Sequence, residues 1–440
     1  MTSTHLVTVA TGPLLDVVAV PGSKSVANRV LVCAALASGT STISNLAPGD
    51  DTAAMLDCLA ALGAGILPGA SGGLALPTDA VTTVTIEGFG GRPRPTGETL
   101  TCRLAGTTSR FVTALAALAT EPVSIDGLPP LRRRPMTPLH DALAALGADV
   151  QPGEAWGHLP VRVCGPLAAG VGGAPASVAI RGDVSSQYIT ALMLVAPYLR
   201  AGLRIELTSP LVSRSYVGIT AAVMAQFGVH GVEVGADVIV VPAGEYVAGD
   251  VRVEPDASSA SYPLSAAAIV GGSVTVPGLT SASLQGDAAF ADVLGEMGCW
   301  IERDDLGTTV RRDGPLRGLD IDMVDMSDLV PTLAVVAPFA HTRTRIRGVG
   351  FIRAKESDRL GDLCAELRRA GVLATETADG LEVEPGPPHG ARLGTHHDHR
   401  LAMAFGLLGL YVPGIEVEDP GVVSKSWPAY WAMLDELAAP

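Results

Sequence analysis

The sequence predicts an α/β protein built from six copies of one βαβ-type module, because two recurrent phrases each occur about six times. The first phrase is an amphipathic helix that ends at a glycine. The second is a helix, a turn of small residues and a strand. Six copies in 440 residues give about 73 residues per repeat, the size of one supersecondary unit.

In the first phrase, apolar residues recur at i, i+3, i+4 and i+7, and a glycine follows where a helix C′ residue is expected. The copies read MLDCLAALGAGI (55–66), LHDALAALGADV (139–150), TAAVMAQFGVHGV (220–232), FADVLGEMGCWI (290–301) and LCAELRRAGVLA (363–374), and YWAMLDELAAP (430–440) is a sixth helix. The second phrase covers residues 32–46, 114–128, 193–207, 264–279, 334–349 and 405–419. Each pair of phrases therefore predicts two helices and at least one strand.

Composition favours a globular enzyme or binding protein over a nucleic-acid or membrane protein. The net charge is −15, whereas a reader of phosphate backbones is normally basic. No apolar run approaches the ~20 residues of a membrane span, and the N-terminus has no basic segment typical of a signal peptide. The six cysteines lack C-x-x-C spacing, which predicts free thiols in a reducing, cytoplasmic compartment.

The stretch PGSKSVANR (21–29) follows an apolar run and opens a helical pattern. It is not a nucleotide P-loop, because Ser23 precedes Lys24 and Val18 stands where the first glycine belongs. A polar turn at a helix start offers free N–H groups and the positive end of the helix dipole to an anion. Taken by itself, the turn is equally compatible with an ordinary N-cap and a solvated lysine.

The same kind of helix start recurs in every repeat, as PGSKS, LAGTTSR, GDVSSQ, PDASSAS, DMSDLVP and THHDHR. We take Ser25, Ser109, Ser186, Ser258, Asp328 and His399 as anchors that mark these helix starts, and each repeat therefore opens a helix with Ser, Thr, Asp or His. Routine capping explains each start singly, but not the cations and paired serines in the same first turns. If equivalent starts face one place, they create a positive site within an acidic protein. Only three of the 30 basic residues are lysines, and all three, Lys24, Lys355 and Lys425, lie in polar turns.

Nine motifs in order resemble the 3-phosphoshikimate 1-carboxyvinyltransferase (EPSP synthase) family of enolpyruvyl transferases. They are PGSKSVANR, LAGTTSRF, RRRPMTPLHDAL, GDVSSQYITAL, DASSASY, LQGD, IRAKESDRL, HHDHRLAMA and SKSWPAYW, and they span nearly the whole chain. The resemblance implies a two-lobed inside-out α/β barrel of six βαβαββ units, three per lobe. One lobe is expected at 22–248 and the other at 1–21 plus 249–440, with the active site in the cleft between them.

The resemblance also implies a reaction. The enolpyruvyl group of phosphoenolpyruvate moves to the 5-hydroxyl of shikimate 3-phosphate, and phosphate leaves by addition and elimination. The expected partners are these two small molecules, with no nucleic acid and no membrane, and the expected state is a monomer. No cofactor and no metal are expected.

Site residues follow from the family motifs. The implied catalytic residues are Asp328 as base on the 5-hydroxyl, Glu356 as acid toward the methylene carbon, and Lys24 between the substrates. The implied shikimate 3-phosphate ligands are Lys24, Ser25, Arg29, Ser185, Ser186, Gln187, Ser213, Tyr216, Asp328 and Lys355. The implied phosphoenolpyruvate ligands are Lys24, Gly106, Arg134, Gln187, Arg359, Arg400 and Lys425.

The KESDR stretch allows two interpretations. On a helix, Lys355 and Arg359 are i,i+4 neighbours on one face, with Glu356 beside them. Such strings usually form surface salt bridges, and only the other motifs favour a catalytic role. His399 is either a capping or a functional residue near the cleft, whereas His396 and His397 are expected at the surface.

Four positions depart from the family pattern. Leu104 replaces an asparagine that is common two residues before the glycine of the phosphate loop, so an amide is missing there. Thr137, Ser215 and Phe351 are smaller departures, and none removes a charge.

Two rival functions remain open. A sister enolpyruvyl transferase acting on UDP-N-acetylglucosamine, or a paralogue in a secondary pathway, would share the fold. The former would show Lys-Asn in place of Lys24–Ser25 and a reactive cysteine, which the stretch 128–138 lacks. An inactive relative that only binds anionic metabolites is a rival of another class.

Overall fold

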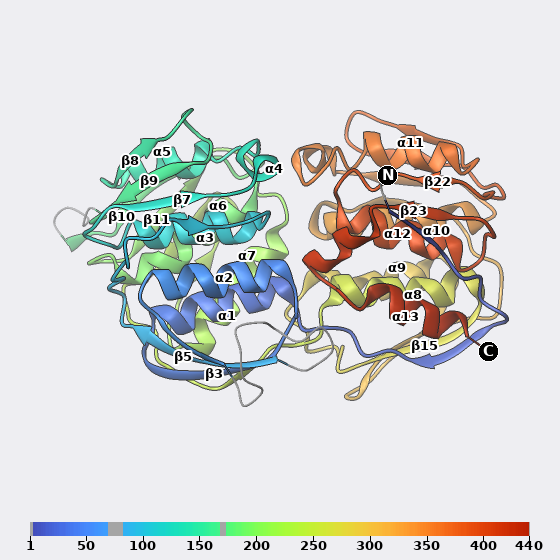
Figure 1. Ribbon diagram of the computed structural model, residues 1–440, viewed down its shortest axis with the longest axis horizontal. Helices are drawn as coiled ribbons and strands as arrows, with labels where there is room; N and C mark the ends of the chain where they lie inside the picture. The colour runs from blue at the N-terminus through green and yellow to red at the C-terminus, as the bar shows by residue number, and fades with distance from the viewer. Residues whose placement is uncertain (1–2, 69–81, 168–172, 440) are drawn as a thin grey trace. The chain divides into compact units, whose positions relative to one another are not determined.

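The computed structural model describes residues 3–68, 82–167 and 173–439, which divide into two compact units. One unit comprises residues 22–253, and the other comprises residues 1–21 together with 254–440. Figure 1 follows the chain through both. Each unit is built from three modules, and within the described residues five of the six have the expected βαβαββ composition, whereas the sixth has three strands.

The unit of residues 22–253 contains three four-stranded sheets with one pattern, a parallel pair followed by two antiparallel partners. Its first module consists of α1 (Lys24–Leu36), β3 (Ser38–Leu46), α2 (Asp50–Ala61), β4 (Gly65–Pro68), β5 (Thr82–Phe89) and β14 (Val251–Arg252). The second consists of β6 (Leu100–Thr101), α3 (Gly106–Ala116), β7 (Val123–Asp126), α4 (Pro129–Arg132), α5 (Thr137–Ala145), β8 (Asp149–Pro152) and β9 (Val161–Cys164). The third consists of β10 (Ala176–Ile180), α6 (Ser186–Val195), η2 (Ala196–Tyr198), β11 (Leu203–Leu207), α7 (Arg214–Gln226), β12 (Glu233–Val234) and β13 (Val238–Val241).

The unit of residues 1–21 and 254–440 repeats this plan with two four-stranded sheets and one of three strands. Its first module consists of β2 (Leu14–Val17), α8 (Ala257–Val270), β15 (Gly272–Pro277), η3 (Gly286–Ala289), α9 (Phe290–Glu296), β16 (Trp300–Arg303) and β17 (Gly307–Arg312). The second consists of β18 (Asp320–Asp322), η4 (Val324–Leu329), α10 (Val330–Val336), η5 (Ala337–Phe339), β19 (Thr344–Arg347), η6 (Gly350–Ala354), α11 (Gly361–Arg369), β20 (Ala374–Glu376) and β21 (Leu381–Val383). The third consists of β22 (Arg392–Leu393), α12 (His399–Gly409), β23 (Glu416–Glu418), η7 (Pro420–Lys425), α13 (Tyr430–Ala438) and β1 (Thr4–Leu6).

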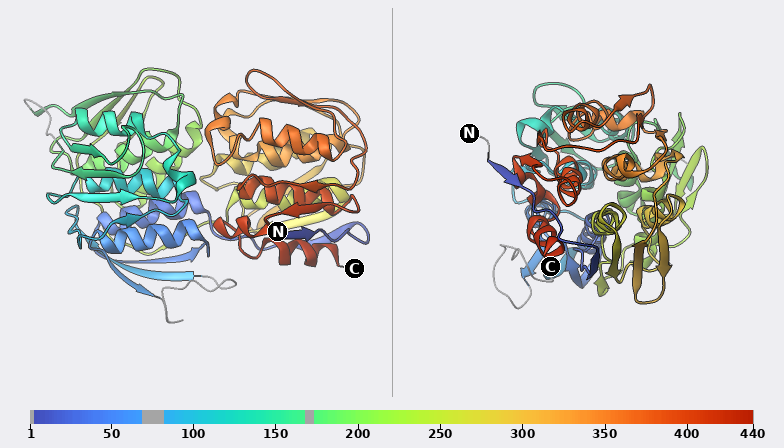
Figure 2. Two further views of the ribbon diagram at one scale, coloured as in Figure 1. Left: turned by 45° about the horizontal axis from the view of Figure 1, so that its top comes forward. Right: turned by 90° about the vertical axis from the view of Figure 1, so that its right-hand side faces the viewer.

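The chain passes between the units twice because sheets in both units are completed by remote strands. β1 pairs with β23 and β2 pairs with β15, so the N-terminal segment belongs with the C-terminal half, as Figure 2 shows for the blue strands among red and yellow elements. In the other unit, β14 pairs in parallel with β3. The second boundary therefore lies at 253/254 rather than at 248/249.

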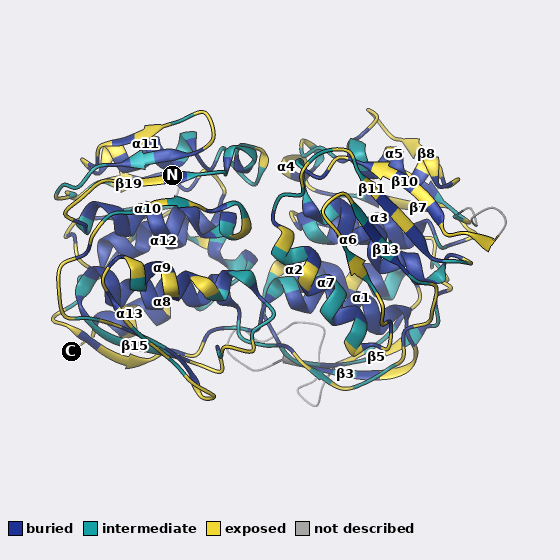
Figure 3. Ribbon diagram, turned by 180° about the vertical axis from the view of Figure 1, so that it is seen from behind, coloured by how far each residue is buried: buried dark blue, intermediate teal, exposed yellow. Residues whose placement is uncertain are grey.

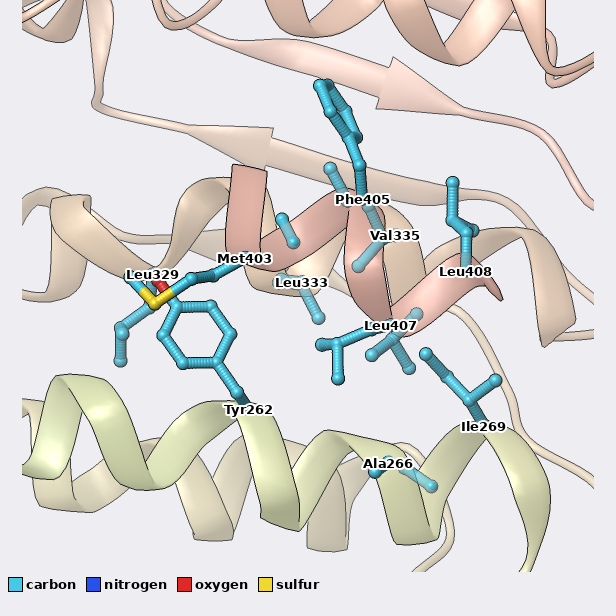
Figure 4. Packing of buried hydrophobic residues seen from close by; sticks show 14 of the residues in the cluster. Tyr262, Ala266, Ile269, Leu329, Leu333, Val335, Met403, Phe405, Leu407 and Leu408 are labelled. Carbon is cyan, nitrogen blue, oxygen red and sulfur yellow. The ribbon is translucent and has the colours of Figure 1, made fainter. Parts of the chain in front are cut away.

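The first helix of each module lies inside its unit, and the second lies nearer the surface. α10 and α12 are buried along their whole length, and α8 is buried at every position except Val270. These three helices pack on one another, and Figure 4 shows Tyr262 and Ile269 of α8 facing Met403 and Leu407 of α12. α1, α3 and α6 form the equivalent core of the other unit, and Figure 3 shows the contrast between buried and exposed helix faces.

The strands form separate open sheets within the described ranges, and these do not close into a barrel. The helix–glycine phrase is confirmed by the backbone, because the glycine that follows the second helix has a positive φ in five modules. These residues are Gly63, Gly147, Gly228, Gly298 and Gly371. A left-handed residue at C′ ends a helix with little strain when it is glycine.

Candidate active site

A buried arginine, Arg359, is the centre of a polar cluster in the unit that contains α8, α10 and α12. Its side chain is 1% exposed. Nε donates to Asp398 Oδ2 at 2.6 Å, and one terminal nitrogen donates to Asp328 Oδ1 at 2.9 Å. The other terminal nitrogen donates to Glu356 Oε2 at 2.7 Å and to Asp398 Oδ1 at 3.2 Å. A planar guanidinium suits this arrangement because its donors point in fixed directions toward several carboxylates.

Helix starts position two of these carboxylates. Asp398 is the N-cap of α12, and its side chain accepts from the backbone N–H of Arg400 at 2.9 Å. Asp328 lies in η4, directly before α10. His399 follows the cap, is 1% exposed, and has Nδ1 3.6 Å from Asp398 Oδ1. The starts of α10 and α12 therefore meet at the same cluster.

Three further cations surround the carboxylates. Arg400 donates to Asp328 Oδ2 at 2.8 Å, and Lys355 Nζ lies 3.9 Å from Asp328 Oδ1. Lys425 Nζ lies 3.3 Å from Glu356 Oε1. Together with Arg359 and Asp398, the cluster contains four cations and three carboxylates. Its excess of positive charge suits an anionic ligand.

Two carboxyl groups of this unit, those of Asp328 and Asp287, have pKa values shifted in opposite directions. Burial alone would raise the pKa of Asp328, but Arg400, Lys355 and Arg359 outweigh it and hold that pKa well below its usual range. Asp287 behaves in the opposite way: burial, with Asp328 adding to it, raises its pKa to about 7. Asp287 also accepts a hydrogen bond from the Ser258 hydroxyl in the first turn of α8.

The KESDR stretch is not helical, so the predicted i,i+4 face of Lys355 and Arg359 is wrong. Lys355 follows η6 with φ −82° and ψ −140°, and α11 begins only at Gly361. Asp358 explains the late start, because its side chain accepts from the backbone N–H groups of Leu360 at 3.2 Å and Gly361 at 3.0 Å. The irregular backbone nevertheless brings the lysine and the arginine to the same carboxylate, Asp328.

In the unit of residues 22–253, Lys24 opens α1 and pairs with Asp51 at the start of α2. The Nζ–Oδ2 distance is 3.3 Å, and the side chains are 16% and 4% exposed. Thr108 on α3 donates to the backbone carbonyl of Asp51 at 3.4 Å, which ties the starts of three helices together.

Two arginines lie beside the start of α3. Arg110 donates to the carbonyl of Gly106 at 2.9 Å and to that of Pro135 at 3.1 Å. At Gly106 a Cβ would lie 2.4 Å from a terminal nitrogen of Arg134, so any larger residue would require this guanidinium to shift. The glycine therefore lets a guanidinium lie directly against the first turn of the helix.

The start of α6 joins the same group. Ser185 caps the helix by accepting from the backbone N–H of Gln187 at 3.3 Å, and Ser186 is buried in the first turn. Gln187 Nε2 donates to the Thr107 hydroxyl of α3 at 3.3 Å. Lys24, Ser185, Ser186 and Gln187 thus lie at the starts of α1 and α6, beside the start of α3.

Arg29 lies deeper than its predicted ligand role suggests. It is 2% exposed and donates to Thr220 Oγ1 at 2.8 Å, to the carbonyl of Ser25 at 2.6 Å and to that of Tyr216 at 3.1 Å. Burial lowers its pKa to about 10. The Tyr216 ring lies against it, and Ser213, with φ +53°, precedes α7.

The six residues taken as anchors lie at the expected helix starts but are not themselves the caps. The side chains that cap helix starts are Ser23, Ser185, Asp256 and Asp398. Ala105 precedes α3 without a side-chain cap, and η4 runs directly into α10. A cap has a non-helical backbone, whereas the anchors lie inside a helical turn: Ser25, Ser109, Ser186, Ser258, Asp328 and His399. Ser109, for example, donates to the carbonyl of Gly106 within α3.

Asp328, Lys355, Glu356, Arg359, Arg400 and Lys425 form one group in their unit, and the other predicted site residues belong to the unit of residues 22–253. Three partners were missed: Asp51, Asp287 and Asp398. Asp398 stood within the quoted HHDHR motif, and Asp287 within LQGD. Nothing in the sequence pairs Asp51 with Lys24.

The described parts of the chain contain neither a cluster of metal ligands nor a helix suited to span a membrane. No group of three or more His, Cys, Asp or Glu side chains there is arranged to hold a metal ion. Likewise, no helix in residues 3–68, 82–167 and 173–439 is both long and apolar enough to cross a bilayer. All six cysteines are free.

Comparisons with known proteins assign the family. The model of "EPSP synthase (3-phosphoshikimate 1-carboxyvinyltransferase)" matches residues 9–434. Proteins named 3-phosphoshikimate 1-carboxyvinyltransferase are similar along the chain: that of Nostoc punctiforme is 40% identical and covers 97% of both chains, and that of Methanoculleus marisnigri is 39% identical and covers 96% of this chain and 97% of its own.

Solved structures share the fold. An EPSP synthase from Acinetobacter baumannii superposes with a TM-score of 0.80 at 23% identity, covering 99% of this chain and 98% of its own. The enolpyruvyl transferase NikO from Streptomyces tendae superposes with a TM-score of 0.76 at 18% identity, covering 100% and 98%. With relatives 40% identical over nearly the full length and a family model that spans it, the chain belongs to the EPSP synthase (3-phosphoshikimate 1-carboxyvinyltransferase) family.

Proposed function

We propose that this chain is an enolpyruvyl transferase that moves the 1-carboxyvinyl group of phosphoenolpyruvate to the 5-hydroxyl of shikimate 3-phosphate, the step of the shikimate pathway that leads toward chorismate. The observation that carries the proposal is the cluster around Arg359, where four cations meet three carboxylates in a chain of this family. Both substrates carry a phosphate and a carboxylate, and such groups favour arginine clamps and helix starts.

The two groups of residues serve one reaction in this proposal. Phosphoenolpyruvate binds to Lys24, Gly106, Arg134, Gln187, Arg359, Arg400 and Lys425. Shikimate 3-phosphate binds to Lys24, Ser25, Arg29, Ser185, Ser186, Gln187, Ser213, Tyr216, Asp328 and Lys355. Each substrate thus takes ligands from both units, and the two sets act on the same pair of molecules.

The chemistry needs two proton movements. The 5-hydroxyl oxygen attacks C2 of phosphoenolpyruvate and gives up its proton, while C3 gains a proton. Phosphate then leaves from C2 and C3 loses a proton, which regenerates the double bond in the product. Glu356 is the acid toward C3, and Asp328 is the base on the hydroxyl.

Asp328 is a weak base as it stands, because Arg400, Lys355 and Arg359 hold its pKa low. Bound substrates change this balance. Their phosphate and carboxylate groups compete for Arg400 and Lys355, so less positive charge acts on Asp328 and its pKa rises toward a useful value. Substrate binding therefore activates the base.

We also propose that the enzyme acts as a monomer, without a cofactor, in the cytoplasm. Six free cysteines in the chain support a reducing compartment. Light scattering during gel filtration tests the oligomeric state, and fractionation of the producing cell tests the compartment.

The test of function is phosphate release on mixing. Purified protein is incubated with phosphoenolpyruvate and, in turn, shikimate 3-phosphate, shikimate or UDP-N-acetylglucosamine. We expect phosphate to form from phosphoenolpyruvate only when shikimate 3-phosphate is the acceptor. Release with UDP-N-acetylglucosamine alone would assign the chain to the sister activity, and binding without release would assign it to an inactive relative.

A further inference from the structure

A buried acid on α11, Glu366, holds the loop that leads into α12. Its side chain is 1% exposed. Oε2 accepts from the backbone N–H of Gly394 at 3.0 Å, and Oε1 lies 2.8 Å from His396 Nε2. Arg369 adds a contact at 3.3 Å to Oε2, and Asp362, also on α11, lies 3.5 Å from His396 Nδ1. Side chains of α11 therefore bind both the backbone of this loop, at Gly394, and the side chain of His396.

The loop is in a conformation that needs such support. His396 and His397 have φ values of +51° and +59°, a left-handed backbone that residues other than glycine rarely adopt. The approach to Glu366 is also tight, because a Cβ on Gly394 would lie 3.3 Å from Glu366 Oε1 and 3.4 Å from His396 Nε2.

The loop leads directly to the cluster around Arg359. Asp398 N donates to the Thr395 carbonyl at 2.8 Å, which closes the turn. The Asp398 carboxylate, which is fully buried, then holds Arg359 at 2.6 Å and caps α12 at the N–H of Arg400. A shift of the loop therefore moves the partner of one arginine and the helix start that carries another.

We propose that Glu366 and His396 are positioning residues for the phosphoenolpyruvate site, acting through the 394–398 loop and Asp398 on Arg359 and Arg400. The inference rests on the proposed function. Neither residue belongs to the predicted site, and His396 was expected to be an ordinary surface histidine. A hydrogen bond to a buried carboxylate, such as that between His396 and Glu366, is among the stronger kinds. Without it, we expect the loop to relax from its left-handed backbone.

The chain offers a matched pair of variants, His396→Asn and His397→Asn. Asparagine tolerates the left-handed backbone, so both variants are expected to fold. In His396→Asn the shorter side chain does not reach Glu366. His397, by contrast, is 81% exposed, and its Nδ1 lies 3.4 Å from Asp419 Oδ2, away from Glu366.

The two variants are expected to differ in one kinetic constant. We expect His396→Asn to raise KM for phosphoenolpyruvate about tenfold, with KM for shikimate 3-phosphate within about twofold. His397→Asn is expected to leave both within about twofold of wild type. His396→Gln, which restores a donor of similar reach, is expected to recover most of the loss.

Hydrogen exchange of the amides of residues 394–402 gives a readout that does not depend on turnover. We expect faster exchange in His396→Asn and in Glu366→Ala, and wild-type exchange in His397→Asn. If His396→Asn matches His397→Asn in both KM and exchange, the positioning role is overturned. If the wild-type protein transfers no enolpyruvyl group, the proposed function has failed. If hydrogen exchange is nevertheless faster in His396→Asn and Glu366→Ala but not in His397→Asn, the structural role of Glu366 and His396 in holding the loop is still supported.

Discussion

Replacing Glu356 by glutamine removes the proposed acid while preserving the shape of the side chain. The carboxylate accepts from Arg359 at 2.7 Å and lies 3.3 Å from Lys425 Nζ. A glutamine oxygen can still accept from Arg359. That buried guanidinium also keeps Asp328 and Asp398 as partners, so it stays paired with carboxylates in the variant.

The expected loss is therefore in turnover. A positioned general acid contributes roughly 10²- to 10⁴-fold, or about 3–5 kcal/mol of transition-state stabilisation. We expect kcat for Glu356→Gln to fall by that factor, with the affinity for shikimate 3-phosphate changed less than about threefold. Phosphate release gives kcat, and isothermal titration gives the affinity.

A surface pair supplies the control. Glu376 accepts from Arg353 at 2.7 Å, and both side chains are about one-third exposed. Glu376→Gln makes the same chemical change away from the cluster and should alter kcat less than about twofold, because exposed ion pairs contribute little. The acid role is refuted if Glu356→Gln keeps a kcat within about threefold of wild type, or if its loss of activity only follows a loss of folded protein.

Three further predictions concern single residues. Gly106→Ala places a Cβ 2.4 Å from a terminal nitrogen of Arg134, so this flexible guanidinium must shift from its position as a proposed ligand. KM for phosphoenolpyruvate should then rise by about two- to fivefold in steady-state assays, and an unchanged KM would contradict a ligand role for Arg134 in that position. Burial raises the pKa of Asp287 from 3.8 to about 7, so unfolding releases its proton between these pH values. As pH rises through this range, the free energy of unfolding of the wild type should therefore fall by on the order of 3 kcal/mol relative to that of Asp287→Asn. Urea unfolding at both ends of the range checks this, and a difference between the two proteins that stays constant with pH would contradict it. Gly63→Ala forces a φ of +99° on alanine with its Cβ 2.8 Å from the carbonyl of Arg94, so the free energy of unfolding should fall by at least about 1 kcal/mol, which calorimetry checks.

The repeats could be predicted from the sequence because they depend on local chemistry. A helix that ends at a glycine carries its own signal, and Gly63 and Gly371 have the positive φ that this signal implies. Counting such patterns indicated an α/β protein of six repeats, whereas the strand order within a repeat and the two-lobed arrangement were implied by the family motifs. The exact starts of the inner helices did not follow, since several polar residues stood in each first turn and any of them could have been the cap.

The partners inside the site could not be predicted because they are remote in the sequence. Arg359 binds Asp398 and Asp328, which lie far along the chain in either direction, and only the packing of α10 against α12 brings them together. The KESDR stretch illustrates the same limit. Its spacing favoured a helix, but Asp358 accepts from the first N–H groups of α11 and so ends the irregular segment instead of joining a helix.

The most direct measurement is the affinity of shikimate 3-phosphate for two lysine variants, one from each unit. Lys24→Met removes a cation from the start of α1, and Lys355→Met removes one beside Asp328. If a single substrate is bound by both units, each variant should weaken binding in isothermal titration by about tenfold or more, the value of one charged hydrogen bond. An affinity unchanged in either variant would contradict a site shared by the two groups of residues.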